Sequence, residues 1–172
     1  MSDSTIQTTR LELRPLPSAA AAALPDDRET AAHLLGVSVP PEWPQAELLD
    51  VLPSQAAAAH GEERFGVWMI VERESRTVIG DIGFIGPPGD EGTVEIGFSV
   101  IPDRRGRGYA TEAARALVDW ALRQPGVGSV VAGCDNENVP SIRTLERIGF
   151  VCLGERDGQL RWRLETAPPD QG

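Results

Sequence analysis

The amino-acid sequence predicts a single α+β domain. Its 172 residues suit one domain with one hydrophobic core. Segments typical of strands fill the middle of the chain, and segments with helical spacing of apolar residues lie on either side of them. Neither an internal repeat nor a linker divides the sequence. We therefore expect one domain over residues 1–172, with a flexible tail at about 167–172, where the chain is polar and rich in proline.

The first element is a strand near the N-terminus. The order Leu11-Glu12-Leu13-Arg14-Pro15-Leu16 alternates apolar and polar residues, as a half-buried strand does, and Pro17 ends it. Ala-rich segments follow, in which Asp26 and Asp27 are candidate helix starts. A further helix is expected over residues 45–60. These helices carry no catalytic signature.

The remaining elements are strands interrupted by two helices. The pattern predicts strands at 65–73, 78–86 and 93–101, a helix at 108–123, a buried strand at 127–134, a short helix at 141–148, and a closing hairpin of 150–154 with 159–165. The strand–helix–strand unit between Thr93 and Cys134 predicts two parallel neighbouring strands, joined by a right-handed crossover.

Composition and charge limit the function classes. A formal net charge of −10 disfavours nucleic acid and mildly favours a cationic substrate such as an amine. Cys134 and Cys152 lie in apolar stretches and match no metal spacing, so both are expected to be reduced core residues. The N-terminus lacks the features of a signal peptide, and the longest apolar run is far shorter than the about 20 residues that span a bilayer. The sequence therefore predicts a cytoplasmic protein that binds neither nucleic acid nor membrane.

One segment, residues 100–113, has the pattern of an anion-binding loop. It runs from a strand through a glycine-containing loop into a helix, which aims free backbone N–H groups and the positive end of a helix dipole at one point. Gly106 and Gly108 let the backbone approach a phosphate or pyrophosphate without side-chain obstruction. Positive charge is added by Arg104, Arg105 and Arg107. The alternative is a solvated basic turn before an ordinary helix.

Two other phosphate-binding loops do not fit this segment. A nucleoside-triphosphate loop needs Lys followed by Ser or Thr after its last glycine, and this chain has Tyr109 and Ala110 there. A dinucleotide-binding loop needs three glycines within six residues and an acidic residue after a second strand. Neither pattern is met.

Two motifs in this order resemble the GNAT superfamily of N-acetyltransferases. Arg105-x-x-Gly108-x-Ala110, after a strand that ends in Pro102, resembles the acetyl-CoA signature of that family. Asn138-Val139-Pro140-Ser141, followed by a helix that ends in Gly149-Phe150, resembles its second element. Together with residues 9–16, these motifs resemble the branch of ribosomal-protein N-terminal acetyltransferases, called RimJ/RimL-like.

The resemblance implies a fold and a cosubstrate. The fold is a mixed, mostly antiparallel seven-stranded sheet with helices on both faces, whose central strands are parallel and splayed at the CoA site. The cosubstrate is acetyl-CoA, used without a metal. The residues implied to bind it are Phe98, Ser99, Val100, Arg105, Gly106, Arg107, Gly108, Tyr109, Ala110, Thr111 and Asn138.

Catalysis on an amine needs a proton acceptor, because a free alkylamine titrates near about 10 and must be neutral to attack. Glu95 is the candidate base, on the strand before the loop, where the resembling family often carries a glutamate that acts through water. The alternative is an exposed strand glutamate with no role. Ser141 is the candidate general acid by resemblance, because the single tyrosine, Tyr109, lies in the loop. The alternative is that Asn138 or Ser141 only caps the following helix.

The predicted function is transfer of an acetyl group from acetyl-CoA to a primary amine by direct attack. The acceptor is expected to be a protein N-terminus or a small amine, and a homodimer is expected from the resembling branch. One competing hypothesis is a catalytically inactive module that binds or senses acyl-CoA. Another is a nucleotide-binding domain, which predicts tighter binding of ATP than of CoA.

Overall fold

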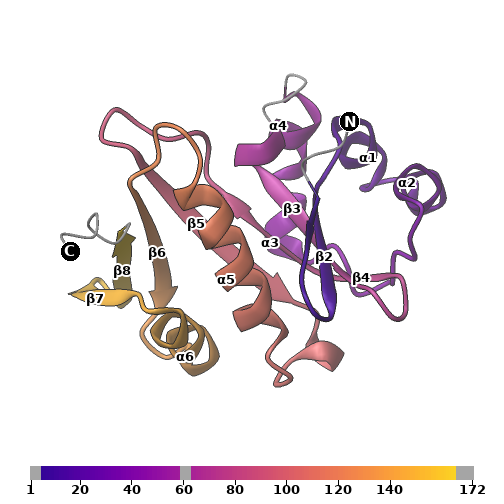
Figure 1. Cartoon of the computed structure of the whole chain (residues 1–172). Helices are drawn as coiled ribbons and strands as arrows, with labels where there is room; N and C mark the ends of the chain where they lie inside the picture. Colours follow the sequence, from indigo (N-terminus) through magenta and orange to yellow (C-terminus); the bar gives the residue numbers. More distant parts are fainter. Residues whose placement is uncertain (1–4, 59–62, 166–172) are drawn as a thin grey trace.

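The computed structural model describes residues 5–58 and 63–165 and shows one mixed sheet with helices packed against it (Figure 1). Among these residues the sheet has eight strands, in the spatial order β1-β2-β3-β4-β5-β6-β8-β7. The strands are β1 (Ile6–Gln7), β2 (Leu11–Pro15), β3 (Val67–Glu72), β4 (Thr77–Phe84), β5 (Thr93–Val100), β6 (Ser129–Asp135), β7 (Val151–Arg156) and β8 (Gln159–Glu165). The pair β5–β6 is parallel and the other neighbours are antiparallel. The predicted α+β class and mostly antiparallel sheet are therefore confirmed.

The helices in the described ranges are mostly short. They are α1 (Ser18–Ala23), α2 (Arg28–Leu35), α3 (Ala46–Leu49), α4 (Leu52–Ala56), α5 (Tyr109–Leu122) and α6 (Val139–Ile148), with 3₁₀ turns at Glu63–Phe65 and Pro102–Arg104. Helix α2 begins after Asp27, whose carboxylate accepts a hydrogen bond from the backbone N–H of Thr30. Asp27 is therefore the helix start that the sequence indicated. Within the described part of the chain, no helix is long and apolar enough to cross a bilayer.

Helices cover both faces of the sheet. Residues an odd number of positions apart in a strand point to opposite faces, so Asp81 and Phe84 of β4 do so. The indole of Trp43, which lies between α2 and α3, donates a hydrogen bond to Asp81. On the other face, Trp120 of α5 packs against Phe84 with ring centroids 5.9 Å apart. Helix α5 therefore lies across one face, as Figure 1 shows, and the segment around α3 covers the other.

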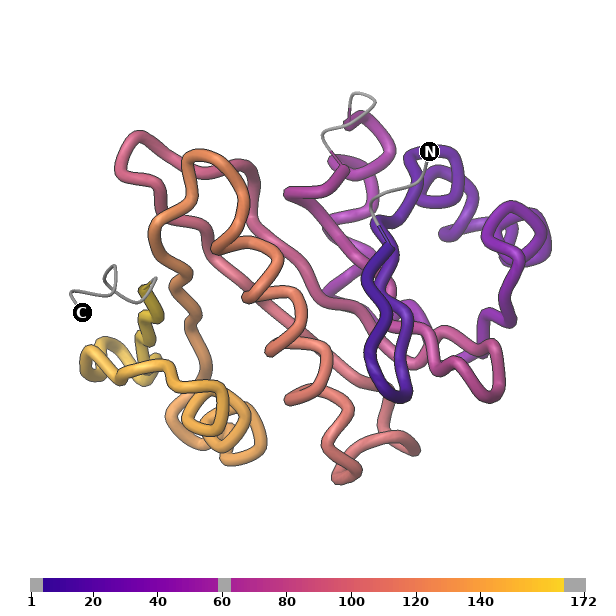
Figure 2. Tube along the Cα trace, in the orientation of Figure 1, coloured from indigo at the N-terminus to yellow at the C-terminus, as the bar shows by residue number. Residues whose placement is uncertain are grey.

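The two parallel strands at the centre of the sheet separate partway along their length. Strands β5 and β6 pair at four positions, from Thr93 with Ser129 to Ile96 with Ala132. Beyond these positions β5 pairs only with β4, and β6 pairs only with β8. Figure 2 shows the two strands diverging from a common end. The predicted parallel and splayed central strands are confirmed.

Three details differ from the sequence-based expectation. The sheet gains a strand, β1, which is only two residues long and leaves no alternating pattern to detect. The helix predicted over 45–60 is instead the short pair α3 and α4, because Pro53 has no N–H to continue a helix from α3. Cys152 is exposed on the edge strand β7, whereas Cys134 is buried as expected. The end of the 45–60 segment and the tail at 167–172 lie outside the described residues.

Candidate active site

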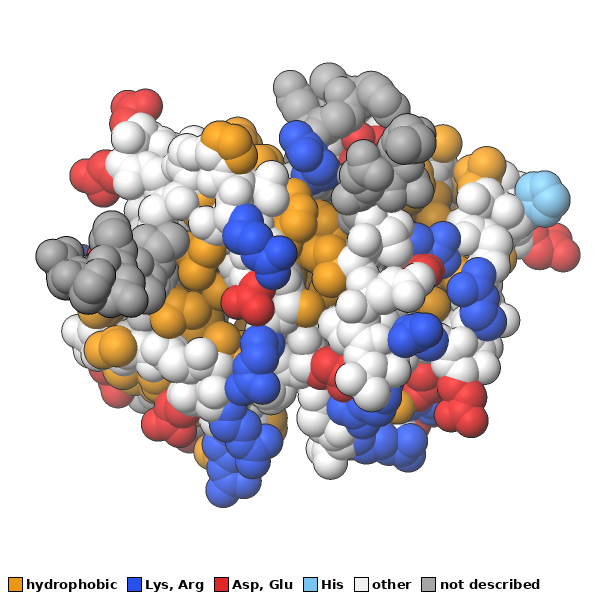
Figure 3. Space-filling model, in the orientation of Figure 1, with side chains coloured by type: hydrophobic (Ala, Val, Ile, Leu, Met, Phe, Trp, Pro, Cys, Tyr) orange, Lys and Arg blue, Asp and Glu red, His pale blue; other side chains and the backbone are white. Residues whose placement is uncertain are grey.

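A cavity of about 850 Å³ opens where β5 and β6 separate. It is bounded by the second half of β5, by the loop and first turn of α5, by the start of α6, and by α3. All of the site residues predicted from the sequence line it except Glu95 and Arg107: Phe98, Ser99, Val100, Arg105, Gly106, Gly108, Tyr109, Ala110, Thr111, Asn138 and Ser141. In the view of Figure 3, basic side chains gather toward the lower edge of the molecule, near the start of α5.

The loop before α5 has the conformation of an anion cradle. Gly106 and Gly108 have φ angles of 76° and 82°, in the left-handed region that glycine adopts without a steric penalty. Gly108 is the residue before the helix, and its carbonyl accepts the N–H of Glu112 at 3.0 Å. No side chain caps this helix start, so the N–H groups of its first turn are free to bind a ligand. The positive end of the helix dipole adds to the attraction of an anion.

Two arginines of the loop differ in their contacts. Arg105 is hydrogen-bonded to the end of β5, whereas Arg107 lies outside the cavity lining. The Arg105 Nε donates to the Val100 carbonyl at 2.7 Å, which holds the loop against the strand. Arg107 is exposed and does not line the cavity, although its carbonyl accepts a hydrogen bond from Arg10 at 2.9 Å. The loop is therefore fixed at both ends by arginine–carbonyl contacts.

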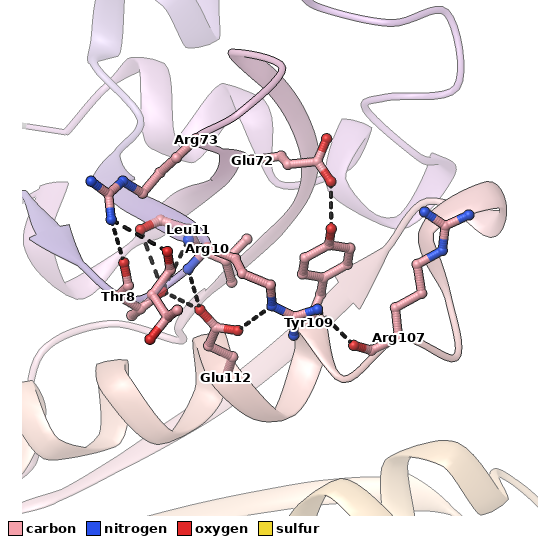
Figure 4. Close-up of polar contacts among 9 residues, drawn as sticks. Thr8, Arg10, Leu11, Glu72, Arg73, Arg107, Tyr109 and Glu112 are labelled. Atoms are coloured by element: carbon pink, nitrogen blue, oxygen red, sulfur yellow. Dashed lines mark hydrogen bonds and ion pairs between the residues drawn. The ribbon is translucent and has the colours of Figure 1, made fainter.

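A polar network connects the first turn of α5 to the segment between β1 and β2 (Figure 4). Both oxygens of Glu112 accept hydrogen bonds from Arg10, from Nε at 2.7 Å and from the backbone N–H at 2.8 Å. The Thr8 hydroxyl donates to the same carboxylate at 2.5 Å. Burial alone would raise the pKa of Glu112, but these hydrogen bonds and the Arg10 charge outweigh it and lower the pKa. The segment between β1 and β2 thus anchors the helix start.

Tyr109, the first residue of α5, belongs to the same network. Its hydroxyl donates to Glu72 at 2.5 Å, and this hydrogen bond, with burial, raises the pKa of the phenol. The Arg10 guanidinium lies 4.2 Å from the centre of its ring, within cation–π distance. Tyr109 therefore supports the loop through its contacts with Glu72 and Arg10.

The gap between the strands exposes backbone donors of β5. The N–H of Ile85 donates to the Glu95 carbonyl and the N–H of Ile101 donates to the Ile79 carbonyl, so the odd-numbered residues of β5 bond to β4. Because bonding direction alternates along a strand, the N–H groups of Phe98 and Val100 point toward the side from which β6 has separated. Such donors can stabilise an oxyanion.

Asn138 and Ser141 lie together at the start of α6. The Asn138 side-chain oxygen accepts the backbone N–H of Ser141 at 3.3 Å, so Asn138 is the residue that caps this helix. Asn138 therefore caps the helix while its side-chain NH₂ group remains available, and its binding role stays a prediction. The Ser141 hydroxyl has no hydrogen-bond partner among the described residues and borders the cavity.

Glu95 lies beside the cavity lining rather than in it. Its carboxylate forms an ion pair with Arg161 of β8, with Oε2 and Nη1 3.3 Å apart. It shares a sheet face with Ser99, four residues further along β5, which corresponds to roughly 13 Å of strand. Its catalytic role stays a prediction.

The sequence reasoning missed the residues that border the cavity on the α3 side. Gln45 accepts the Ser99 hydroxyl at 2.9 Å and donates to the Val100 carbonyl at 3.3 Å. Asp81 of β4 lies directly across from Ser99 and accepts the indole N–H of Trp43 at 2.9 Å. Burial, with a smaller contribution from the charge of Glu47, raises the pKa of Asp81 to about 6, against the lowering effect of the Trp43 hydrogen bond.

Comparison with known proteins agrees with this geometry. The sequence matches the family described as acetyltransferase (GNAT) domain over residues 10–151. It is 32% identical over 164 residues to the uncharacterized N-acetyltransferase YjdG of Bacillus subtilis, covering 94% of this chain and 98% of that protein.

Solved structures share the fold. An acetyltransferase from Agrobacterium tumefaciens is 29% identical with a TM-score of 0.65, and the match covers 96% of each chain. A ribosomal-protein alanine acetyltransferase from Vibrio fischeri is 17% identical with a TM-score of 0.69, covering 95% of this chain and 97% of that chain. The chain described here belongs to the GNAT acetyltransferase family and is an acetyl-CoA-dependent N-acetyltransferase.

Proposed function

We propose that the acceptor is a primary amine, carried by a peptide N-terminus or by a small molecule, which attacks acetyl-CoA directly. The observation that carries this proposal is the gap between β5 and β6. There the strand N–H groups and the uncapped start of α5 face a single cavity that also has room for an acceptor. Direct attack needs both substrates in one space, because the reacting atoms must approach to about 3–3.5 Å.

In this proposal each end of acetyl-CoA has its own set of partners. The first turn of α5 and the Arg105–Thr111 loop hold the pyrophosphate, with Arg107 adding charge from outside. An N–H of Phe98 or Val100 binds the thioester carbonyl and stabilises the oxyanion. The Asn138 side-chain NH₂ group donates to the pantetheine arm, and the free Ser141 hydroxyl protonates the leaving thiolate. Their common location on the cavity wall supports these assignments.

Two observations support the choice of acceptor class. They are the charges that line the cavity and the name of a structurally similar protein. The cavity is lined by the carboxylates of Asp81 and Glu47, and carboxylates attract a protonated amine. The Vibrio fischeri relative is named for a ribosomal protein, but at 17% identity it shows a common fold, so we take from it only a reason to test peptides. A homodimer stays a prediction, which light scattering of the purified protein checks.

The test is a screen of primary amines and short peptides with acetyl-CoA, read out as release of free CoA thiol. It is best done on Cys152→Ser, because exposed Cys152 would react with the thiol reagent. Mass spectrometry of the product confirms amide formation. Release with one class of amine supports the proposal. Tight acetyl-CoA binding without release from any acceptor contradicts it and favours a binding module, and tighter binding of ATP than of CoA favours a nucleotide-binding domain.

A further inference from the structure

The charges that line the cavity come from different elements. The arginines Arg104, Arg105, Arg143 and Arg147 come from the loop before α5 and from α6. Among the described lining residues, the carboxylates are Asp81 of β4 and Glu47 of α3. The Arg105 guanidinium also reaches the α3 side, where Nη2 donates to Gln45 at 3.5 Å. The cavity therefore holds cations for the anionic cosubstrate and carboxylates for a cationic acceptor.

Asp81 lies on the strand next to the one that carries the N–H donors. It is the cross-strand partner of Ser99, which lies between Phe98 and Val100, and such partners have Cα atoms about 5.5 Å apart. Its side chain points to the same sheet face as that of Ser99. The acceptor side of the cavity floor is open here, because Gly97 carries no side chain and a Cβ there would meet no atom within 4 Å.

The partners of Asp81 leave one of its oxygens free. Oδ2 accepts the Trp43 indole N–H at 2.9 Å, which fixes the orientation of the carboxylate. Within residues 5–58 and 63–165, Oδ1 has no hydrogen-bond partner, and no arginine lies within ion-pair distance of the group. The side chain of Asp81 is half-buried and lines the cavity, so Oδ1 is open to a ligand or to water there.

We propose that Asp81 is the general base that deprotonates the acceptor amine; this rests on the proposed function above. Oδ1 takes one proton from the ammonium nitrogen, directly or across one water. The nitrogen lone pair forms the C–N bond, and the C–S bond breaks with its electron pair on sulfur. The Ser141 hydroxyl gives its proton to the thiolate and regains one from the remaining excess proton on nitrogen, which leaves the amide and the CoA thiol. Asp81 then loses its proton to solvent.

The electrostatics of the site agree with this role. Burial raises the pKa of Asp81 to about 6, so the group is ionised at neutral pH yet more basic than an exposed aspartate. The charged groups that face the same cavity are Glu47, Arg104, Arg105, Arg143 and Arg147. Of these, Glu47 raises the pKa of Asp81. Glu95, by contrast, has its carboxylate paired with Arg161.

The experiment compares Asp81→Asn with Asp119→Asn, which removes an exposed carboxylate of α5 outside the cavity. It uses an acceptor found in the amine screen and measures kcat and KM for both substrates from about pH 5 to 9. Calorimetry gives the affinity for CoA. Asp81→Asn is expected to lower kcat by about 10²–10⁴-fold and to remove the acidic limb of the pH profile near 6, with unchanged CoA affinity. Asp119→Asn is expected to behave as the unmodified chain.

Three outcomes overturn the inference. If Asp81→Asn keeps kcat and the acidic limb, Asp81 does not take the proton. If it raises only the KM for the amine, Asp81 binds the acceptor and does not act as a base. If Glu95→Gln removes the acidic limb while Asp81→Asn keeps it, Glu95 is the base. In each of these cases the unmodified enzyme still acetylates the amine, so the proposed function stands. If the unmodified enzyme acetylates no amine, both the proposed function and the role of Asp81 are refuted.

Discussion

Asp81→Asn is expected to make the folded protein more stable near neutral pH. Asparagine has the shape of aspartate, and its carbonyl oxygen can still accept the Trp43 indole N–H. The substitution therefore removes a charge from a poorly hydrated position and changes little else. A more stable but inactive variant would also exclude misfolding as the reason for lost turnover.

The size of the gain follows from the pKa of Asp81. That pKa is about 6 in the folded protein against 3.8 for the exposed group. The difference is about two units, and each unit corresponds to about 1.4 kcal/mol. The folded state binds the Asp81 proton more tightly than the unfolded state does. The free energy of unfolding therefore falls as pH rises from 3.8 to about 6, and the loss is complete above that range. Asp81→Asn avoids this loss and gains about 2–3 kcal/mol, or about 5–10 °C in Tm.

Urea unfolding of both proteins between about pH 4.5 and 8 measures this difference. The gain in Asp81→Asn should be about 1 kcal/mol at the acidic end, increase with pH, and become constant above about pH 6.5. Asp119→Asn controls for the loss of one surface charge and should stay within about 0.5 kcal/mol of the unmodified chain. If Asp81→Asn is less stable than the unmodified chain at neutral pH, or if its gain in the free energy of unfolding does not vary with pH, burial does not raise the pKa of Asp81.

Three other substitutions or measurements test the rest of the site. Gly108→Ala places a Cβ on a backbone with φ of 82°, so it should lower the free energy of unfolding by about 1–2 kcal/mol. Calorimetry should show acetyl-CoA binding weakened about tenfold. Gly89→Ala is the control, because a Cβ at Gly89 would meet no atom within 4 Å. Glu112→Gln should lower the free energy of unfolding by about 1 kcal/mol at pH 7. Denaturation at lower pH should show this difference vanish as pH falls through the lowered pKa of Glu112. A thiol reagent followed by peptide mass spectrometry should label Cys152 first, since burial raises the pKa of Cys134.

The side of the cavity that we propose binds CoA could be predicted because its signals are local. The glycines of the loop, the helix that follows it and the Asn138–Ser141 motif each lie within a few consecutive residues. The backbone conformation of Gly106 and Gly108 is set by those residues themselves. Long, regular elements such as α5 and β5 were predicted for the same reason, since their apolar spacing repeats over two or more turns or pleats.

The acceptor side could not be predicted because it forms through distant contacts. Trp43 and Asp81 are 38 positions apart, and Gln45 and Ser99 are 54 apart. A single aspartate between apolar strand residues has the same alternation as a solvent-facing one, so its burial leaves no trace in the sequence. Similarly, Cys152 lies in an apolar stretch but is exposed, because β7 is the last strand of the sheet and its burial depends on what covers it.

The divided centre of the sheet also bears on how the protein resists unfolding. Sheets usually fray at their edges, because edge strands have only one neighbour. Here the pairing is interrupted in the middle of the sheet, between β5 and β6. Four residue pairs join the half formed by β1–β5 to the half formed by β6–β8. A pantetheine arm that bonds along the open edge of β5 would substitute for part of the missing ladder. In that binding mode the cosubstrate would act as a structural member of the sheet, and amide exchange at the centre of the molecule should slow most when it binds.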